Sequence, residues 1–152
     1  MNCLSDAERF ARLQLARTDR IGPVAFDQLI QRFGTALRAV EALPDLIRRG
    51  GGHGYDLAKA DAVEAEIAAG AAVGATLIVL GDAAYPPALA AVDPPPPVLW
   101  TLGDAGLLSR PAIAIVGARI ASAGGQRIAR GLAQQLGQAG HIVVSGLARG
   151  ID

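Results

Sequence analysis

The chain has 152 residues, 51% hydrophobic and 18% charged, a balance typical of a folded globular protein rather than a disordered one. Fourteen basic residues offset fourteen acidic ones, which excludes a uniformly basic DNA-coating protein but permits a local basic site. The single cysteine excludes an intrachain disulfide framework and a cysteine-based zinc site. No apolar run approaches the roughly 20 residues that cross a bilayer, so we expect a cytoplasmic protein without a membrane partner.

The first fifty residues predict a small module of short helices. Ser5 and Glu8 form an S-x-x-E capping box, and Pro23 suits a first helical turn. Gly34 is a natural helix stop and Thr35 an N-cap for the next helix. The expected core positions, at three- and four-residue spacing, are Phe26, Leu29, Ile30, Phe33, Leu37 and Val40. Pro44 is expected to open another turn, and Gly50-Gly51-Gly52 to end the run.

The middle of the chain predicts one helix and two strands. The helix is expected from Asp56, as its cap, to Ala72. Thr76–Leu80 is an apolar run between glycines, which is typical of a buried strand. The proline run at 94–97 excludes helix, and we interpret it as a stiff lead-in to a strand over Val98–Leu102.

The last forty residues predict a βαβ unit with parallel strands. The strands are expected at Ala112–Val116 and His141–Val144, and the helix at Gln126–Gly137 with Ile128, Leu132 and Leu136 facing inward. The fold class is therefore α/β, with an incomplete Rossmann-like parallel sheet that follows a small helical domain. Because a parallel sheet needs more strands, we expect the chain to be part of a longer protein.

Two glycine-rich turns follow the two parallel strands, where ligands of such sheets bind. Bare backbone N–H groups, a helix N-terminus and arginines favour a phosphate there. The net charge is +2 over residues 1–49, −6 over 50–108 and +4 over 109–152, so an anionic ligand is expected to prefer the two ends of the chain, and both turns lie in the last of these segments. The candidate residues are Gly117, Ala118, Arg119, Ser122, Gly124, Ser145, Gly146, Arg149 and Gly150.

Structural interpretations of these residues stay open beside the functional one. The glycines can serve only to make tight turns, Ser122 can be only an N-cap, and Arg149 can pair with Asp152. The turns lack both G-x-G-x-x-G and G-K-[ST], so dinucleotide or Walker-type ATP binding is poorly supported. No cluster of carboxylates or histidines suggests a metal, and we expect no cofactor and no catalytic residue.

The segments AIAIVGAR (112–119) and VVSGLARGID (143–152) resemble the DNA-processing protein DprA (Smf) family. The upstream Tyr85-Pro-Pro-Ala-Leu, Asp93-Pro-Pro and Val98-Leu-Trp-Thr-Leu-Gly-Asp are similar to that family's lead-in. Residues 1–50 resemble its sterile-alpha-motif-like helical domain more loosely. The resemblance implies a helical domain at 1–52 and the first part of an extended Rossmann-like DNA-binding domain at 53–152.

The same resemblance implies a function and its partners. It implies a non-catalytic protein that binds single-stranded DNA, protects incoming strands and loads the RecA recombinase in natural transformation. It also implies a homodimer formed through regions beyond residue 152. The family commonly has an aromatic residue before the helix-opening glycine, where this chain has Ala123 before Gly124.

Two other hypotheses compete with this one. The lysine-decarboxylase-like phosphoribohydrolases share a G-[SA]-R turn and a later S-G-x-x-x-G turn, but also use a P-G-G-x-G-T-x-x-E segment that this chain lacks. The helical module can also be a protein-interaction domain.

The turn Ile21-Gly22-Pro23 of the helical module resembles half of a helix-hairpin-helix, with Arg20 in place of the second glycine. It predicts either a structural turn or an auxiliary DNA contact.

Overall fold

The computed structural model describes residues 4–49 and 56–152, and the chain divides into two compact units, Met1–Ala105 and Gly106–Asp152. The Gly50-Gly51-Gly52 stop lies outside the described residues. The domain boundary that we place between residues 52 and 53 stays a prediction.

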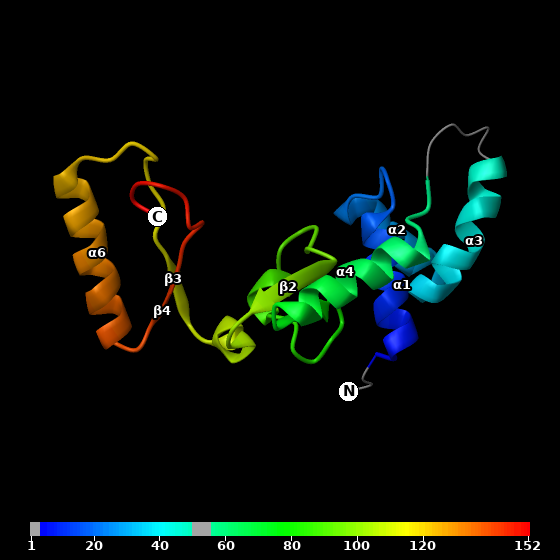
Figure 1. Cartoon of the computed structure of the whole chain (residues 1–152), viewed down its shortest axis with the longest axis horizontal. Helices are drawn as coiled ribbons and strands as arrows, with labels where there is room; N and C mark the ends of the chain where they lie inside the picture. The colour runs from blue at the N-terminus through cyan, green and yellow to red at the C-terminus, as the bar shows by residue number, and fades with distance from the viewer. Residues whose placement is uncertain (1–3, 50–55) are drawn as a thin grey trace. The chain divides into compact units, whose positions relative to one another are not determined.

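The first unit begins with three helices: α1 (Asp6–Arg17), α2 (Pro23–Phe33) and α3 (Ala36–Arg49), labelled in Figure 1. Their predicted start signals are confirmed. The Ser5 hydroxyl accepts a hydrogen bond from the backbone N–H of Glu8 at 3.2 Å, and Thr35 caps α3 in the same way. Pro23 is the first residue of α2, and Gly34 ends that helix at a φ of 80°, where a side chain would be strained.

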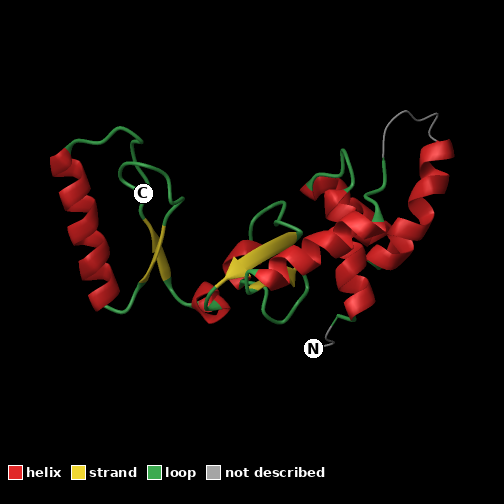
Figure 2. Ribbon diagram, viewed as in Figure 1, coloured by secondary structure: helices red, strands yellow, loops and turns green. Residues whose placement is uncertain are grey.

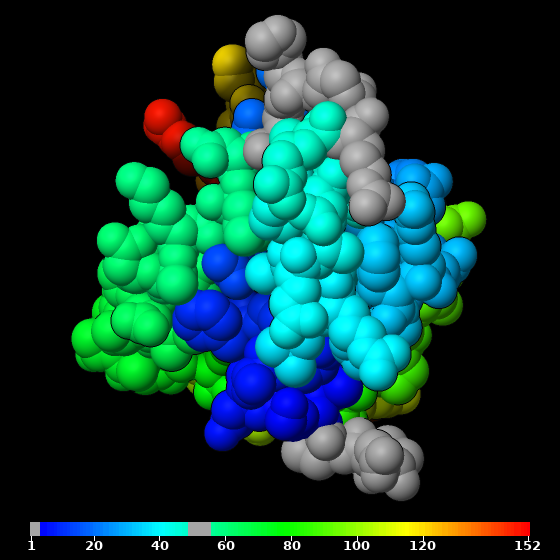
Figure 3. Space-filling model, turned by 90° about the vertical axis from the view of Figure 1, so that its right-hand side faces the viewer, coloured from blue at the N-terminus to red at the C-terminus, as the bar shows by residue number. Residues whose placement is uncertain are grey.

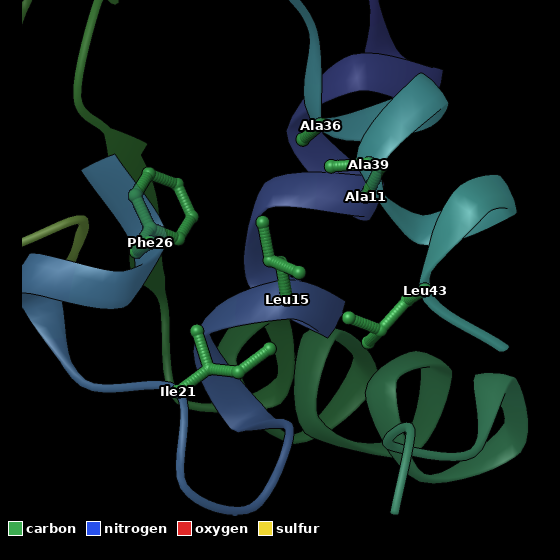
Figure 4. Packing of buried hydrophobic residues seen from close by; sticks show 7 residues of the cluster. All are labelled: Ala11, Leu15, Ile21, Phe26, Ala36, Ala39 and Leu43. Carbon is green, nitrogen blue, oxygen red and sulfur yellow. The ribbon is translucent and has the colours of Figure 1, made fainter. Parts of the chain in front are cut away.

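Apolar side chains from these helices and the turn between the first two form the main core, and Figure 4 shows them converging around Leu15. The buried members are Ala11, Leu15, Ile21, Phe26, Ala36, Ala39 and Leu43. The predicted core position Phe26 is confirmed, at 1% exposure, while Leu29, Ile30 and Phe33 are partly buried against this cluster. Small alanines at the contact let α3 lie close to α1.

The predicted core face of α3 is wrong at Leu37 but not at Val40. Leu37 is 40% exposed, whereas Val40 is partly buried against the core cluster and Ala36 and Ala39 are fully buried. Pro44 is also misplaced, because it lies inside α3 instead of opening a new turn. A proline inside a helix removes one backbone donor and crowds the preceding turn, and Figure 1 shows α3 continuing with a bend.

The remainder of the first unit contains α4 (Ala60–Ala72), β1 (Ala75–Val79), the short α5 (Pro87–Ala90) and β2 (Val98–Leu102). The predicted helix start at Asp56 is wrong. The backbone of Ala58 is held by α1, because its N–H donates to the Thr18 hydroxyl at 3.2 Å and its carbonyl accepts from Gln14 at 2.7 Å. These bonds keep the chain extended until Lys59, so the helix begins at Ala60.

Both strands of this region are confirmed, and they form a separate two-stranded antiparallel sheet in which Ile78 lies opposite Leu99. Gly70 of α4 packs directly against the Trp100 ring of β2. The predicted strands therefore exist, but within the described residues they are not hydrogen-bonded to the parallel pair that follows.

Charged side chains of α1 hold the first unit together. Three of its arginines reach neighbouring elements: Arg9 binds Asp82, Arg12 the carbonyl of Leu80, and Arg17 binds Glu66. The buried Glu8 carboxylate pairs with Arg12 at 2.9 Å and accepts from the backbone N–H groups of Ala36 and Leu37. Glu8 thus caps α3 from α1, and Figure 3 shows the cyan atoms of α3 packed beside the blue atoms of α1.

The second unit contains β3 (Ala112–Ala114), α6 (Ala123–Gln138) and β4 (Ile142–Val144), preceded by the 3-10 helix η1 (Ala105–Ser109). The strands pair in parallel, with Ala112 opposite Ile142, and α6 connects them (Figure 2). The predicted βαβ unit is confirmed. With the helical part of the first unit, it gives a helical domain followed by an incomplete Rossmann-like α/β region.

The predicted inward face of α6 is wrong in part. Ile128 is 74% exposed and Leu132 is 47% exposed, whereas Leu136 is half-buried. The hollow between helix and strands is lined instead by Ala129 and Ala133. Small side chains therefore face the strands at this hollow, and the larger Ile128 and Leu132 side chains are exposed.

Candidate nucleic-acid interface

The candidate site lies where the two parallel strands end. The chain after β3 runs through residues 115–122 into α6, and Ser122 caps that helix by accepting from the Gly125 N–H at 3.1 Å. The chain after β4 runs through residues 145–152, where the Ser145 hydroxyl accepts from the Leu147 N–H at 3.2 Å. Figure 1 shows the two turns side by side at one end of the strands, in yellow and red.

Direct backbone contacts join the two turns. The Ile151 N–H donates to the Ala118 carbonyl at 3.2 Å. Gly150 adopts a φ of 106°, and a Cβ there would overlap Ala118 and lie 2.7 Å from the Arg119 carbonyl oxygen. A Cβ on Gly117 would lie 2.6 Å from that of Ile151. Both glycines are therefore required for the two turns to pack against each other.

A hollow of about 860 Å³ opens between these turns. It is lined by Arg119, Ile120, Ala121, Gln126, Ala148, Arg149 and Gly150. Both arginine side chains are exposed, and neither guanidinium has a hydrogen-bond or ion-pair partner among residues 4–49 and 56–152. The structure thus brings Arg119 and Arg149 to one hollow, and the pairing of Arg149 with Asp152 that we considered is not present.

The other predicted residues take different places. Ser122 and Gly124 do not line the hollow, and Ser145 lines the adjoining one between α6 and the strands. Gly146 lies against Asp152, whose carboxylate oxygen would be 3.0 Å from an added Cβ. Binding of phosphate by any of these residues stays a prediction.

Sequence reasoning missed two residues of this region. Gln126, in the first turn of α6, lines both hollows. Asp152 accepts a hydrogen bond from the Gly117 N–H at 2.9 Å, so this amide is not bare as the sequence had suggested. Asp152 is also the one acidic residue in the segment 109–152, which contains five arginines. A single acid in such a basic segment was the sequence signal that could have identified it as a candidate.

In the turn between α1 and α2, Arg20 stands where a helix-hairpin-helix has its second glycine, and its backbone adopts a conformation typical of glycine. Arg20 adopts a φ of 62°, and Gly22 precedes the first turn of α2 without a side-chain cap. The chain thus accepts a left-handed residue where a helix-hairpin-helix would place glycine. An auxiliary DNA contact at this turn stays a prediction.

In the described part of the chain, no group of three or more His, Cys, Asp or Glu side chains is placed to hold a metal ion. No helix over the same residues combines the length and apolar character needed to cross a membrane.

Comparison with known proteins matches both parts of the chain. The family model for a DprA-like N-terminal HHH domain matches residues 6–69, and the model for DNA recombination-mediator protein A matches residues 76–152. The DNA processing protein DprA of Bacillus subtilis (strain 168) is 39% identical over 80 residues, which cover 52% of this chain and 27% of that relative. The chain therefore belongs to the DNA recombination-mediator protein A family.

Proposed function

We propose that the protein binds single-stranded DNA at the hollow between its two glycine turns, protects incoming strands and loads the RecA recombinase onto them during natural transformation. The observation that carries the proposal is the placement of Arg119 and Arg149, from separate turns, on one open hollow. The family assignment supports a role with DNA and recombination machinery. Formation of a homodimer belongs to the same proposal.

The chemistry of the hollow suits a sugar–phosphate backbone. Two guanidinium groups without protein partners can each form paired hydrogen bonds to phosphate oxygens. The exposed Ile120 side chain on the same wall offers apolar contact to a sugar or base, which a site for free phosphate does not need. Together these groups favour a nucleotide chain over an isolated anion.

The proposed action is binding without catalysis. The Ser145 hydroxyl accepts from the Leu147 amide, and no histidine is among the described residues that line its hollow, which supports a site that binds without a serine nucleophile. Incubation of the full-length protein with AMP tests the phosphoribohydrolase alternative. Release of free adenine would contradict the proposal.

The binding test measures affinity for a single-stranded oligonucleotide at several salt concentrations. Each neutralised phosphate contributes about −0.7 to the slope of log K against log salt on a single strand. We expect Arg119→Ala or Arg149→Ala to weaken binding and to flatten the slope by about one such contact. Isotherms that are unchanged in both variants at every salt concentration would refute the proposed site.

A matched control removes a positive charge at the other end of the strand. Arg110 precedes β3, donates to the Gly140 carbonyl at 3.3 Å and lines neither hollow. Arg110→Ala is expected to keep the wild-type slope, because it alters net charge equally without removing a proposed contact. RecA loading is tested separately, by the rate at which RecA filaments assemble on single strands with and without the full-length protein.

A further inference from the structure

The negative charge of Asp152 lies near a proposed phosphate site, where it would be expected to repel the ligand. The hydrogen bonding of its carboxylate offers an explanation for its position. Its Oδ1 accepts from the Gly117 N–H at 2.9 Å, across 35 residues of sequence. Its Oδ2 lies where Gly146 has no side chain, 3.0 Å from the place a Cβ would take. The carboxylate is therefore bonded to Gly117 of the first turn and lies beside Gly146 of the second.

The contacts next to Asp152 lie close to the two arginines in sequence. The Ile151 N–H donates to the carbonyl of Ala118, which directly precedes Arg119. Gly150, which directly follows Arg149, packs against the carbonyls of Ala118 and Arg119. The backbone that carries each guanidinium is thus held within two residues of a contact between the turns.

We propose that Asp152 is a positioning residue, which fastens the second turn to the first and so sets the spacing of Arg119 and Arg149 for successive phosphates. This inference rests on the proposed function. Asp152 lines the adjoining hollow instead of the one that holds the arginines, so its carboxylate acts through the backbone of Gly117 and not on the nucleic acid.

The sign of a mutational effect separates this role from simple charge. Neutralising an acid near a phosphate site should strengthen binding if only electrostatics matters. Loss of a hydrogen bond to a charged acceptor should weaken binding if the carboxylate positions the turns. Asp152→Ala removes both the charge and the acceptor, whereas Asp152→Asn removes the charge and keeps an oxygen acceptor for the Gly117 N–H.

The experiment measures single-strand affinity of the full-length protein. We expect Asp152→Ala to bind about tenfold more weakly than wild type and Asp152→Asn to bind at least as tightly as wild type. Glu64→Ala is the matched control, because Glu64 is an exposed acid on α4 in the first unit. The amide resonance of Gly117 should shift in Asp152→Ala and stay near its wild-type position in Asp152→Asn.

A second variant keeps the test valid if Asp152→Ala fails to fold by circular dichroism. Gly146→Ala places a Cβ against Oδ2 without any change of charge, and should displace the carboxylate and weaken binding. Wild-type or tighter binding by Asp152→Ala, or weaker binding by Asp152→Asn, would overturn the positioning role alone. Failure of the wild-type protein to bind single strands would overturn the proposed function as well.

Discussion

At the scale of single residues, the Glu66 carboxylate of α4 accepts hydrogen bonds from Arg17 of α1 and Trp100 of β2. Arg17 donates to both of its oxygens, with Nη2 at 2.7 Å from Oε1 and Nε at 2.9 Å from Oε2. The hydrogen bonds from Arg17 hold the pKa of Glu66 below its ordinary value of about 4.5, although burial raises it in opposition. The Trp100 indole N–H, at 2.7 Å from Oε1, lowers the pKa further.

This lowered pKa predicts a pH dependence of stability. Because the folded state holds the charged form of Glu66, its contribution to the free energy of unfolding is fully present above pH 4.5 and is lost as the pH falls through the folded-state pKa. Arg17 is 40% exposed, so the contribution is at most about 1 kcal/mol. Urea unfolding of wild type and Glu66→Gln should differ near neutral pH and converge in acid.

The control for this prediction is Glu64→Gln, an exposed carboxylate on the same helix. We expect it to follow the wild-type profile. A difference between wild type and Glu66→Gln that persists unchanged down to pH 3 would contradict the role of Glu66.

Sequence predicted the local residue contacts and missed the distant ones. The Ser5, Thr35 and Ser122 caps each bond a backbone group three residues away, a spacing that can be read directly. Glu8 caps a helix 28 residues along the chain, and Asp152 binds an amide 35 residues back. Such partners depend on tertiary packing, which a pattern of residue types does not specify.

At the scale of helices and strands, the sequence predicted which elements exist better than it predicted their facing surfaces. Glycine and proline boundaries and the change of apolar period located the strands and most helices. Leu37 of α3 and Ile128 and Leu132 of α6 are exposed against expectation, whereas the alanines at 36 and 39 are buried. The spacing of large apolar residues identifies the buried face of a helix only where the neighbouring elements leave room for a large side chain.

The contact between α4 and β2 gives an element-scale prediction. Alanine is favoured over glycine in a helix by about 1 kcal/mol, so Gly70→Ala should stabilise α4 in isolation. A Cβ at this position would lie 2.6 Å from Cη2 of Trp100, so overpacking should outweigh that gain and destabilise the unit by about 1–3 kcal/mol. Denaturant unfolding followed by the fluorescence of Trp100, the single tryptophan, measures the change.

Gly131→Ala in α6 is the matched variant for comparison. Its added Cβ would have no neighbour within 4 Å, so the helix propensity should act alone and increase helicity measured by circular dichroism. Stabilisation by both substitutions would show that the Trp100 ring yields easily to an added methyl group.

At the scale of the whole molecule, burial is unequal between the two units. Every buried side chain in the described residues lies before residue 87, and none lies in the second unit. A segment of fewer than about 50 residues without a buried core seldom folds alone. The second unit therefore has apolar surface to cover, including Val116, Ile128 and Val144.

This inequality predicts different behaviour of the two units when separated. Residues 1–105 should unfold cooperatively on heating, with the transition seen by Trp100 fluorescence close to that of the intact chain. Residues 106–152 should show no cooperative transition. Sharp cooperative melting and protected amides in the isolated second unit would contradict this expectation.

The ion pairs and hydrogen bonds of the α1 arginines also determine where a chimeric protein can be joined without loss of these contacts. A chimera that takes only residues 1–49 from a relative would lose the native pairing of Arg9 with Asp82 and of Arg17 with Glu66. The Arg12 side chain, paired with Glu8, would also lose its native partner, the Leu80 carbonyl. A crossover after residue 105 leaves all of these pairs intact. Functional chimeras between relatives are therefore expected to join at the later position, even though the helices alone form a recognisable module.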